Sequence, residues 1–345
     1  MSPNLQKPIL QALLHKPNTL LLSMIYKPEL YHGFAKRSPF FEGWYYKQVS
    51  ADNKNTLIFI PGIFIGKSAD STHAFIQVYD GKNGTSWYCR FPAESFIASQ
   101  HEFNIQVGAS RFSRDSIHLD IHQDGVALTG DLNLKDHHPW PVTPLSPGAM
   151  GPYGFLPFME CNHAVLSFTH SIEGSVSLHG TDIDFSQGKG YMEKDWGSAF
   201  PSTYIWFQTN HFEAPETSLF GSLADIPWRN SSFSGFILGF LLKGKLYRYA
   251  TYSGAKIRKL QILEHEIELI TGDRKTELQV SVERHQGAAL YAPYSGEMQT
   301  KIYESLSAKT KVRFYSIAAG VRHLEWEGTA EHTGLECVGS LNFKF

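Results

Sequence analysis

The stretch AFIQVYDGKNGTSWYCRF, residues 74–91, contains two short apolar and aromatic runs separated by a tight turn. Asp80-Gly81 and Asn83-Gly84 supply residues that readily adopt the positive φ angles of hairpin turns. Runs rich in Phe, Ile, Val and Tyr on either side of such a turn are typical of two antiparallel strands. This stretch therefore predicts a β-hairpin, and the rest of the chain follows the same pattern.

Short apolar runs separated by turn residues continue along most of the sequence. Aromatic residues make up 14% of it and charged residues only 19%, which favours sheets with filled interiors over a helical bundle. The sequence therefore predicts an all-β, antiparallel fold with few short helices. The predicted strands occupy residues 44–49, 56–60, 74–79, 87–91, 103–107, 117–121, 164–169, 175–178, 181–185, 206–210, 218–223, 235–242, 245–250, 257–262, 266–271, 277–283, 296–303 and 339–345.

Two features divide this strand pattern. Six prolines and three glycines interrupt residues 136–158, where neither a helix nor a central strand can persist, so a long Pro-rich loop or lid is predicted. A chain of 345 residues also exceeds what one hydrophobic core usually serves. We therefore expect an N-terminal extension over 1–30 and two tandem β domains over 31–188 and 189–345.

A weak internal sequence similarity is compatible with two tandem barrels. Trp44-Tyr45-Tyr46 and Trp206-Phe207-Gln208 each open a series of strands. An ordinary preference of strand starts for aromatic residues explains this similarity equally well. Tandem barrels would hold a small ligand inside one barrel or at their joint.

The net charge and the cysteine content limit which binding partners and which cellular compartment we expect. A net charge of -2 without a long basic run gives no electrostatic footprint for nucleic acid. Three widely separated cysteines fit reduced thiols and a cytoplasmic protein. The longest apolar run, residues 236–242, falls far short of the roughly 20 residues that a spanning helix needs. Residues 9–14 leave open a peripheral membrane contact, and the sequence sets no oligomeric state.

The most distinctive segment is YMEKDWGSAFP, residues 191–201, followed by WFQTN, residues 206–210. It combines acids, a base, indoles and amides, a mixture that a dry core does not need. A face that is both aromatic and hydrogen-bonding is typical of a ligand pocket. Strand alternation places on one such face Tyr204, Trp206, Gln208, Asn210 and Phe212.

Glu193 and Asp195 share one face of this segment if it is extended, with Lys194 opposite. Carboxylates this close shift each other's pKa, so that one of them can act as an acid at neutral pH. A lysine between two acids is equally typical of an ion-pair cluster at the surface. Glu160 and His163, which follow the Pro-rich stretch, add an acid and an imidazole, although a histidine is more often structural than a base.

A second motif, FFEGWYYK at residues 40–47, places Glu42, Trp44 and Tyr46 on one strand face. An acid beside two aromatic rings fits a proton donor in an apolar pocket, because desolvation raises a carboxyl pKa. The alternative is an ion pair between Glu42 and a lysine at the mouth of a barrel. This motif alone favours the ion pair.

The motifs of several other chemistries are missing from the sequence. No HExxH or CxxC spacing occurs, so we predict no metal. No GxGxxG or GxxxxGK[ST] loop and no GxSxG elbow occurs either. These observations favour a chemistry that needs only acids, aromatic rings and a dry cavity, with no cofactor.

Taken together, the motifs resemble the tocopherol cyclase family. The resemblance rests on residues 40–45, on EKDWG at 193–197 with Phe200-Pro201, and on residues 206–210, in the family's order. It implies two lipocalin-like β domains. Supporting pieces are Tyr31-His32-Gly33 and residues 157–163, 290–293 and 296–298.

The resemblance also implies a reaction. Tocopherol cyclases close a prenylated hydroquinone to a chromanol: the side-chain double bond is protonated, and the phenol oxygen captures the tertiary cation. This chemistry needs a neutral carboxylic acid, aromatic faces for the cation and exclusion of water. Two alternatives stay open, namely a non-catalytic protein that binds a lipid or isoprenoid quinone, and a lipocalin-type hydratase or pericyclase.

The expected ligand is thus a hydrophobic small molecule, an isoprenoid or a prenylated aromatic. Asp195 or Glu193 is the expected proton donor, and Glu42 the expected assistant. Asp195 stands where the plant-type pattern of the family has Asn, so the acid or the local charge differs here. The residues expected to bind the substrate are Trp44, Tyr46, Glu160, His163, Trp196, Trp206, Gln208 and Asn210.

Overall fold

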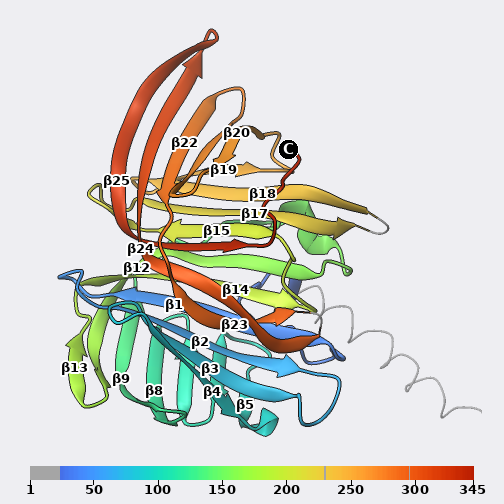
Figure 1. Cartoon of the computed structure of the whole chain (residues 1–345), viewed down its shortest axis with the longest axis vertical. Coiled ribbons are helices and arrows are strands. Elements are labelled where there is room, and N and C mark those ends of the chain that lie inside the picture. Colours follow the sequence, from blue (N-terminus) through green and yellow to red (C-terminus); the bar gives the residue numbers. More distant parts are fainter. Residues whose placement is uncertain (1–23, 229–230, 295) are drawn as a thin grey trace, which may run out of the picture.

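A computed structural model describes residues 24–228, 231–294 and 296–345, and almost all of its regular structure is antiparallel β-sheet. The first of two large sheets has twelve strands and forms the lower half of Figure 1. Its strands, in the order in which they lie side by side, are β4 (Thr85–Phe91), β3 (His73–Asp80), β2 (Thr56–Ile65), β1 (Phe40–Val49), β14 (Gly188–Gly197), β12 (Cys161–Leu178), β9 (Val126–Lys135), β8 (Ser116–Gln123), β7 (Ser110–Ser113), β6 (Asn104–Val107) and β5 (Phe96–Ala98), with β13 (Thr181–Asp184) paired to β12.

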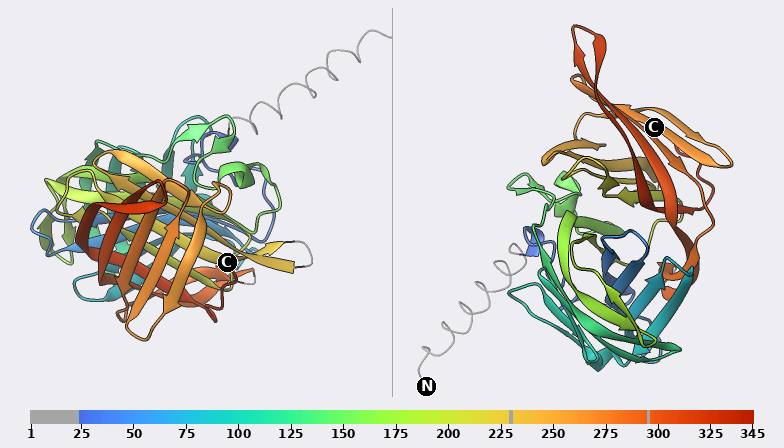
Figure 2. Two further views of the ribbon diagram at one scale, coloured as in Figure 1. Left: turned by 90° about the horizontal axis from the view of Figure 1, so that it is seen from above. Right: turned by 90° about the vertical axis from the view of Figure 1, so that its left-hand side faces the viewer.

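The second sheet has eleven strands, and most of it forms the upper half of Figure 1, while its strand β23 lies beside the first sheet. The right-hand view of Figure 2 shows most of it as a curved layer above the first sheet. Its strands, in lateral order, are β19 (Lys245–Ala250), β18 (Ser231–Leu242), β17 (Ser218–Trp228), β15 (Tyr204–Thr209), β25 (Val321–Val338), β24 (Glu297–Ala318), β22 (Thr276–Glu283), β21 (Glu266–Gly272) and β20 (Lys256–Ile262), with β16 (His211–Phe212) paired to β25 and β23 (Ala288–Tyr294) to β24.

Each sheet encloses its own hydrophobic core, and a third core lies between the sheets. The first core gathers apolar side chains from strands far apart in the first sheet, including Val78 and Ile121. The second core does the same for the second sheet. The predicted all-β fold of two lipocalin-like β units is therefore confirmed.

Strand alternation in three strands creates the third core. In β1, Trp44 belongs to the first core whereas Tyr45 belongs to the core between the sheets. In β15, Ile205 belongs to the second core whereas Trp206 points to the first sheet. Because successive side chains of a strand point to opposite faces, both faces of β1, β14 and β15 are buried.

Several sequence predictions need correction. Residues 339–345 contain no strand, and the strands predicted at 164–169 and 175–178 are one strand, β12. Strands β5, β7, β9, β14, β16, β23 and β25 were not among the predicted strands. The predicted boundary at 188 falls at the start of β14, yet β14 pairs with β1 and β12 in the first sheet, so the change of sheet comes after Gly197.

The Pro-rich stretch is confirmed as a loop. It contains only the two-residue strands β10 (Val142–Thr143) and β11 (Ser146–Pro147) and the short 3-10 helix η2 (Gly151–Phe155). Residues 9–14, for which a membrane contact was left open, lie outside the described residues. In the described part of the chain, no helix is long and apolar enough to cross a membrane.

Candidate active site between the two sheets

A cavity of about 180 Å³ lies between the sheets, where the third core leaves space. Strands of both sheets and the Pro-rich loop contribute to its walls. Apolar and aromatic side chains dominate the lining, and a few polar groups converge among them, as is usual for small-molecule sites. The aromatic part of the lining comprises Phe41, Tyr45, Phe75, Tyr153, Phe200, Tyr204, Trp206, Phe233, Phe236, Tyr252 and Tyr291.

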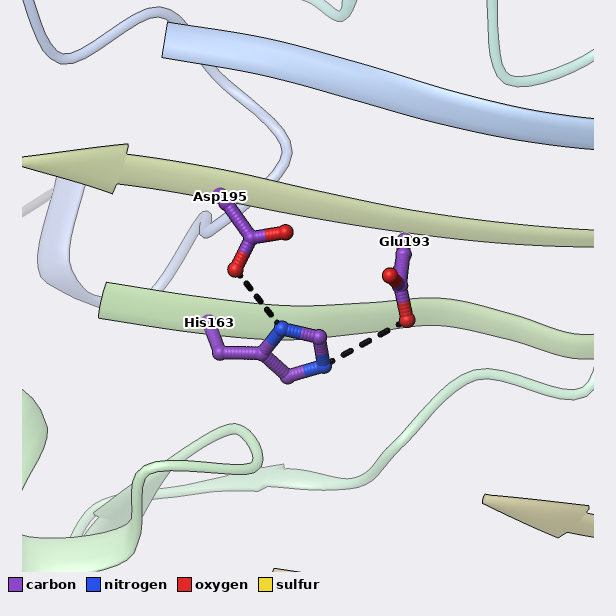
Figure 3. Close-up of side chains that lie close together, drawn as sticks. All are labelled: His163, Glu193 and Asp195. Carbon is purple, nitrogen blue, oxygen red and sulfur yellow. Dashed lines mark hydrogen bonds and ion pairs between the residues drawn. The ribbon is translucent and has the colours of Figure 1, made fainter. Parts of the chain in front are cut away.

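Three of the predicted residues meet at one end of this cavity (Figure 3). His163 on β12 and Asp195 on β14 are direct partners across the sheet, and Glu193 lies two residues before Asp195 on the same face. The Nδ1 atom of His163 lies 2.8 Å from Oδ1 of Asp195, and its Nε2 atom lies 3.6 Å from Oε2 of Glu193. The imidazole therefore stands between two carboxyl groups.

Glu193 is a buried carboxyl whose environment favours the neutral form. Its Oε2 atom accepts hydrogen bonds from the Tyr191 hydroxyl at 2.5 Å and from Trp206 Nε1 at 3.0 Å. Burial is the main reason why the pKa of Glu193 is raised to about 7. His163 lowers this pKa and Asp195 raises it. Near neutral pH a substantial fraction of Glu193 therefore carries a proton.

His163 has the opposite tendency. Burial alone would lower its pKa, but the carboxylates of Asp195 and Glu193 raise it to about 9, so the ring is an imidazolium at neutral pH. The ring stacks on Phe220, with centroids 4.9 Å apart and planes 7° from parallel. Asp195 and Phe220 together fix its orientation, and Nε2 makes no hydrogen bond in the described structure.

Two further carboxyls come from the second sheet. Glu336 on β25 lines the cavity and accepts a hydrogen bond of 2.7 Å from the Tyr204 hydroxyl. Burial, followed by the neighbouring Glu304, raises the pKa of Glu336 well above its usual range. Glu304 on β24 accepts a 2.5 Å hydrogen bond from Tyr45, and burial raises its pKa to about 8.

Lys47 is buried within electrostatic range of Glu304 and Glu193. Its Nζ atom donates to Gln208 Oε1 at 3.1 Å and to the backbone oxygen of His332. The pKa of Lys47 is lowered to about 7, because the effect of burial outweighs the raising effect of Glu304 and Glu193. Burial is the main cause of the raised pKa values of Glu193, Glu304 and Glu336, and neighbouring carboxylates add to it.

The other predicted residues fall into two groups. Glu160 lines the cavity near His163, and burial raises its pKa. Gln208 and Asn210 point to the first sheet as the alternation predicts, but Gln208 contacts Lys47 and the Asn210 amide donates to the Gly190 carbonyl at 2.8 Å. Both amides hold the sheets together beside the cavity.

The predicted convergence of Glu42, Trp44 and Tyr46 with Glu193 and Asp195 is wrong. Glu42, Trp44 and Tyr46 point into the first barrel, whereas Glu193 and Asp195 lie on the other face of the same sheet. The physical reason is register: in strands β1 and β14, the two sets of side chains alternate.

Glu42 is instead part of a buried ion pair, which was the alternative interpretation of its motif. Lys194 Nζ lies 2.5 Å from Glu42 Oε1, and both side chains are fully buried. The ammonium lies over the rings of Trp44 and Trp196, 4.8 and 4.6 Å from their centroids. The Trp196 indole also stacks on His32 at 4.4 Å, so this cluster fastens the N-terminal segment to the barrel.

His163, Glu193 and Asp195 also form the one group in the described residues whose ligand atoms, all within 4.8 Å of one another, fit around a metal ion. Sequence spacing gave no hint of this group, because its members come from two strands. The imidazole already donates its Nδ1–H to Asp195, so the two ligand atoms that remain are His163 Nε2 and Glu193 Oε2, which lie 3.6 Å apart. The prediction of no metal stays a prediction.

Sequence reasoning missed Tyr45, Tyr191, Glu304 and Glu336. The two tyrosines lie inside the quoted motifs, so the strand period could have found them once the buried face was known. Glu336 lies on β25, for which no strand was predicted, and nothing in the sequence pointed to it.

The fold and the site define an all-β protein with two lipocalin-like units and an acid-lined, aromatic cavity between them. The model of the tocopherol cyclase-like family matches residues 135–339, which is more than half of the chain. The chain therefore belongs to the tocopherol cyclase-like family. The matched part includes His163, Glu193, Asp195, Trp206 and Glu336.

Individual relatives agree with this assignment. A probable chloroplastic tocopherol cyclase of Oryza sativa subsp. japonica is 22% identical over 317 aligned residues, and the match covers 76% of this chain and 67% of the relative. The chloroplastic tocopherol cyclase of Zea mays is 26% identical over 144 residues, 40% of this chain and 30% of the relative. A crystal structure of CghA with Sch210972 shares the fold with a TM-score of 0.56 at 10% identity, covering 88% of this chain and 89% of that one.

Proposed function

We propose that this protein is a cofactor-independent cyclase that protonates a prenyl double bond of a prenylated hydroquinone or a similar isoprenoid and forms a chromanol-type ring. The observation that carries the proposal is the Glu193 carboxyl, which is buried in an aromatic cavity with a pKa raised to about 7 by that burial. Membership of the tocopherol cyclase-like family supports the class of reaction.

Glu193 is the proposed proton donor. Both of its hydrogen-bond donors, Tyr191 and Trp206, bind Oε2, which leaves Oε1 to carry the proton. When the proton leaves, the new carboxylate faces the His163 imidazolium at 3.6 Å. The charge that develops in the transition state is thus met by a cation already in place, which lowers the barrier to proton transfer. Asp195 acts through His163, as a positioning residue.

The tertiary cation needs stabilisation until the ring closes. Tyr45, Phe200 and Trp206 line the same cavity as Glu193, and an aromatic face attracts a cation through its quadrupole. Capture by the phenol oxygen forms the C–O bond, and the phenolic proton returns to the Glu193 carboxylate. The cycle balances without an oxidant, a reductant or a cofactor, as an isomerisation must.

The oxygen end of the substrate needs a partner as well. Glu336 lines the cavity, carries a pKa raised by burial and accepts from Tyr204 through Oε2. A neutral carboxyl in that position can donate its own proton in a hydrogen bond to a phenol oxygen. Glu336 and Tyr204 are therefore the proposed anchors of the hydroquinone ring.

The test is direct. Purified protein is incubated at pH 6.5 with a prenylated hydroquinone, and the product is separated by chromatography and identified by mass. We expect an isomer of unchanged mass with the chromanol retention time. A product heavier by one water identifies a hydratase, and a substrate that binds but stays unchanged with every prenylated aromatic and polyene tried identifies a binding protein. Either result contradicts the proposal.

A further inference from the structure

The surface beside the site carries a group of exposed apolar side chains on two adjoining segments. Leu145 is 82% exposed at the tip of the small β10–β11 hairpin, and Phe158 is 52% exposed at the end of the Pro-rich loop. Large exposed apolar side chains on adjoining segments mark an interaction surface more often than a random surface. The group, here named the docking face, comprises Tyr26, Val142, Leu145, Phe155 and Phe158.

The two segments of the docking face are fixed to each other. The Tyr26 hydroxyl donates to the Pro144 carbonyl at 3.0 Å, which ties the N-terminal segment to the hairpin tip. The Tyr26 ring packs edge-on against Phe155 with centroids 6.1 Å apart. Leu145 is therefore displayed on a tethered hairpin, next to aromatic side chains.

The exposed charges on the N-terminal segment of the docking face are cations, and the acid Glu160 lies in the wall of the cavity behind it. Lys27, Lys36 and Arg37 are exposed on its N-terminal segment. Between residues 24 and 39, the one acid is Glu29, which is half-buried and pairs with Arg114 at 3.3 Å. Residues 141–159 contain no acid at all. An apolar face bordered by exposed cations complements the anionic headgroups of a bilayer.

Behind the docking face lies a second, outer cavity of about 650 Å³. Phe155 and Phe158 of the docking face line it, together with Met24 and Ile25. The outer cavity and the cavity that contains Glu193 are adjacent, since the residues that line both are Met150, Met159, Glu160, His163 and Pro227.

The volumes explain why two cavities are useful. Pockets that enclose a drug-sized ligand measure roughly 300–1,000 Å³. The inner cavity of about 180 Å³ has room for the reacting end of a lipid, but not for a long apolar tail. A tail that continues past Met150 and Met159 would occupy the outer cavity, whose mouth is at the docking face.

We propose that the docking face binds the surface of a bilayer with anionic lipids, so that an apolar substrate passes from the membrane through the outer cavity to Glu193. Leu145 and its aromatic neighbours insert among the acyl chains, and the three cations contact the headgroups. The proposal depends on the proposed function only for the apolar nature of the substrate. Binding to vesicles is measured without substrate, so each proposal can fail on its own.

The experiment is flotation of the full-length protein with phosphatidylcholine vesicles that contain either no phosphatidylglycerol or about one third phosphatidylglycerol. We expect the wild-type protein to float with the anionic vesicles and to dissociate as salt is raised. Val142→Asp with Leu145→Asp should lower the bound fraction at least tenfold, and so should Lys27→Glu with Lys36→Glu and Arg37→Glu.

Matched controls change the same chemistry elsewhere on the surface. Val321→Asp with Leu324→Asp alters two exposed apolar residues of β25, and Lys54→Glu with Lys309→Glu and Arg313→Glu alters three exposed cations. These variants should float like the wild-type protein. Equal flotation of the docking-face variants and their controls, or no flotation of the wild-type protein, would overturn the proposal. Circular dichroism of each variant checks that it is folded.

Discussion

His163 and Asp195 are direct cross-strand partners, and Nδ1 of the imidazole lies 2.8 Å from Oδ1 of the carboxylate. This contact fixes the ring so that its other nitrogen, Nε2, lies 3.6 Å from Oε2 of Glu193. One imidazolium therefore serves two carboxyls: it pairs permanently with Asp195, and it stabilises Glu193 whenever Glu193 loses its proton. The functional predictions follow from this arrangement.

Replacing the proton donor should remove the chemistry and leave the fold intact. Glu193→Gln keeps the shape of the side chain and an oxygen for Tyr191 and Trp206 to bind, but it has no acidic proton. We expect kcat to fall by about 10² to 10⁴, the usual contribution of general acid catalysis. Glu264→Gln, at a carboxyl whose side chain is 87% exposed, is the matched control and should keep full activity. An unchanged kcat in Glu193→Gln would show that another group delivers the proton.

Changing a hydrogen bond to the donor should shift the pH profile. The donor must be protonated, so kcat should decline as the pH rises through about 7, the pKa of Glu193 that burial produces. The Trp206 hydrogen bond lowers this pKa. Trp206→Phe keeps an aromatic face but removes that bond, so the alkaline limb of the profile should move to higher pH. A limb that moves to lower pH, or does not move, contradicts the assignment of Glu193.

The His163–Asp195 pair should leave a signature in stability. Although burial opposes it, the two carboxylates raise the folded-state pKa of His163 from 6.5 to about 9. A raised pKa gives stability that is fully present below the unfolded value and is lost as the pH rises through the folded value. The free energy of unfolding of the wild-type protein should therefore decrease between pH 6.5 and about 9, by up to about 3 kcal/mol at 1.36 kcal/mol per unit.

Asp195→Asn is the variant that tests this signature. It removes a carboxylate that raises the His163 pKa, so the decrease in unfolding free energy over the same pH range should become smaller. Urea unfolding at several pH values between 6 and 9.5, roughly the window between the two pKa values, gives the comparison. Identical pH dependence in the two proteins would mean that Asp195 does not control the charge of His163.

The Glu42–Lys194 pair predicts an effect on stability. Both side chains are fully buried and their charged atoms lie 2.5 Å apart. Lys194→Met leaves the Glu42 carboxylate without its partner and should cost about 3–5 kcal/mol. Glu42→Gln combined with Lys194→Met removes both charges and should cost less than the sum of the two single changes. A strictly additive double-mutant cycle, measured by urea unfolding, would show that the pair is not coupled.

The sequence predicted the fold better than the geometry of the site. Turn pairs such as Asp80-Gly81 and alternating apolar runs specify hairpins locally, which is why most strands were placed correctly. The alternation from Tyr204 correctly pointed Trp206 to the site. The predicted face continues only as far as Asn210, because Phe212 belongs to the second core.

In β1 both faces are buried. Its pattern therefore could not tell the face of Glu42 from the face of Tyr45.

Glu336 shows a different limit. The first half of β25 extends from the body of the protein in a long hairpin with β24 (Figure 1), and its residues from Val321 to Glu325 are exposed. That half lacks the apolar alternation by which a half-buried strand is recognised. With the strand missed, its C-terminal half was missed too, and Glu336 is placed at the cavity by the pairing of β25 with β15 and β24.

The most direct test of the central claim is the mass of the product formed in D₂O. If Glu193 protonates the double bond, each molecule of chromanol should contain one non-exchangeable deuterium on the ring carbon that was alkenic, because the donor exchanges with solvent between turnovers. The wild-type protein should give this singly labelled product, and Glu193→Gln should give almost none. Ring closure without deuterium at that carbon would contradict the account.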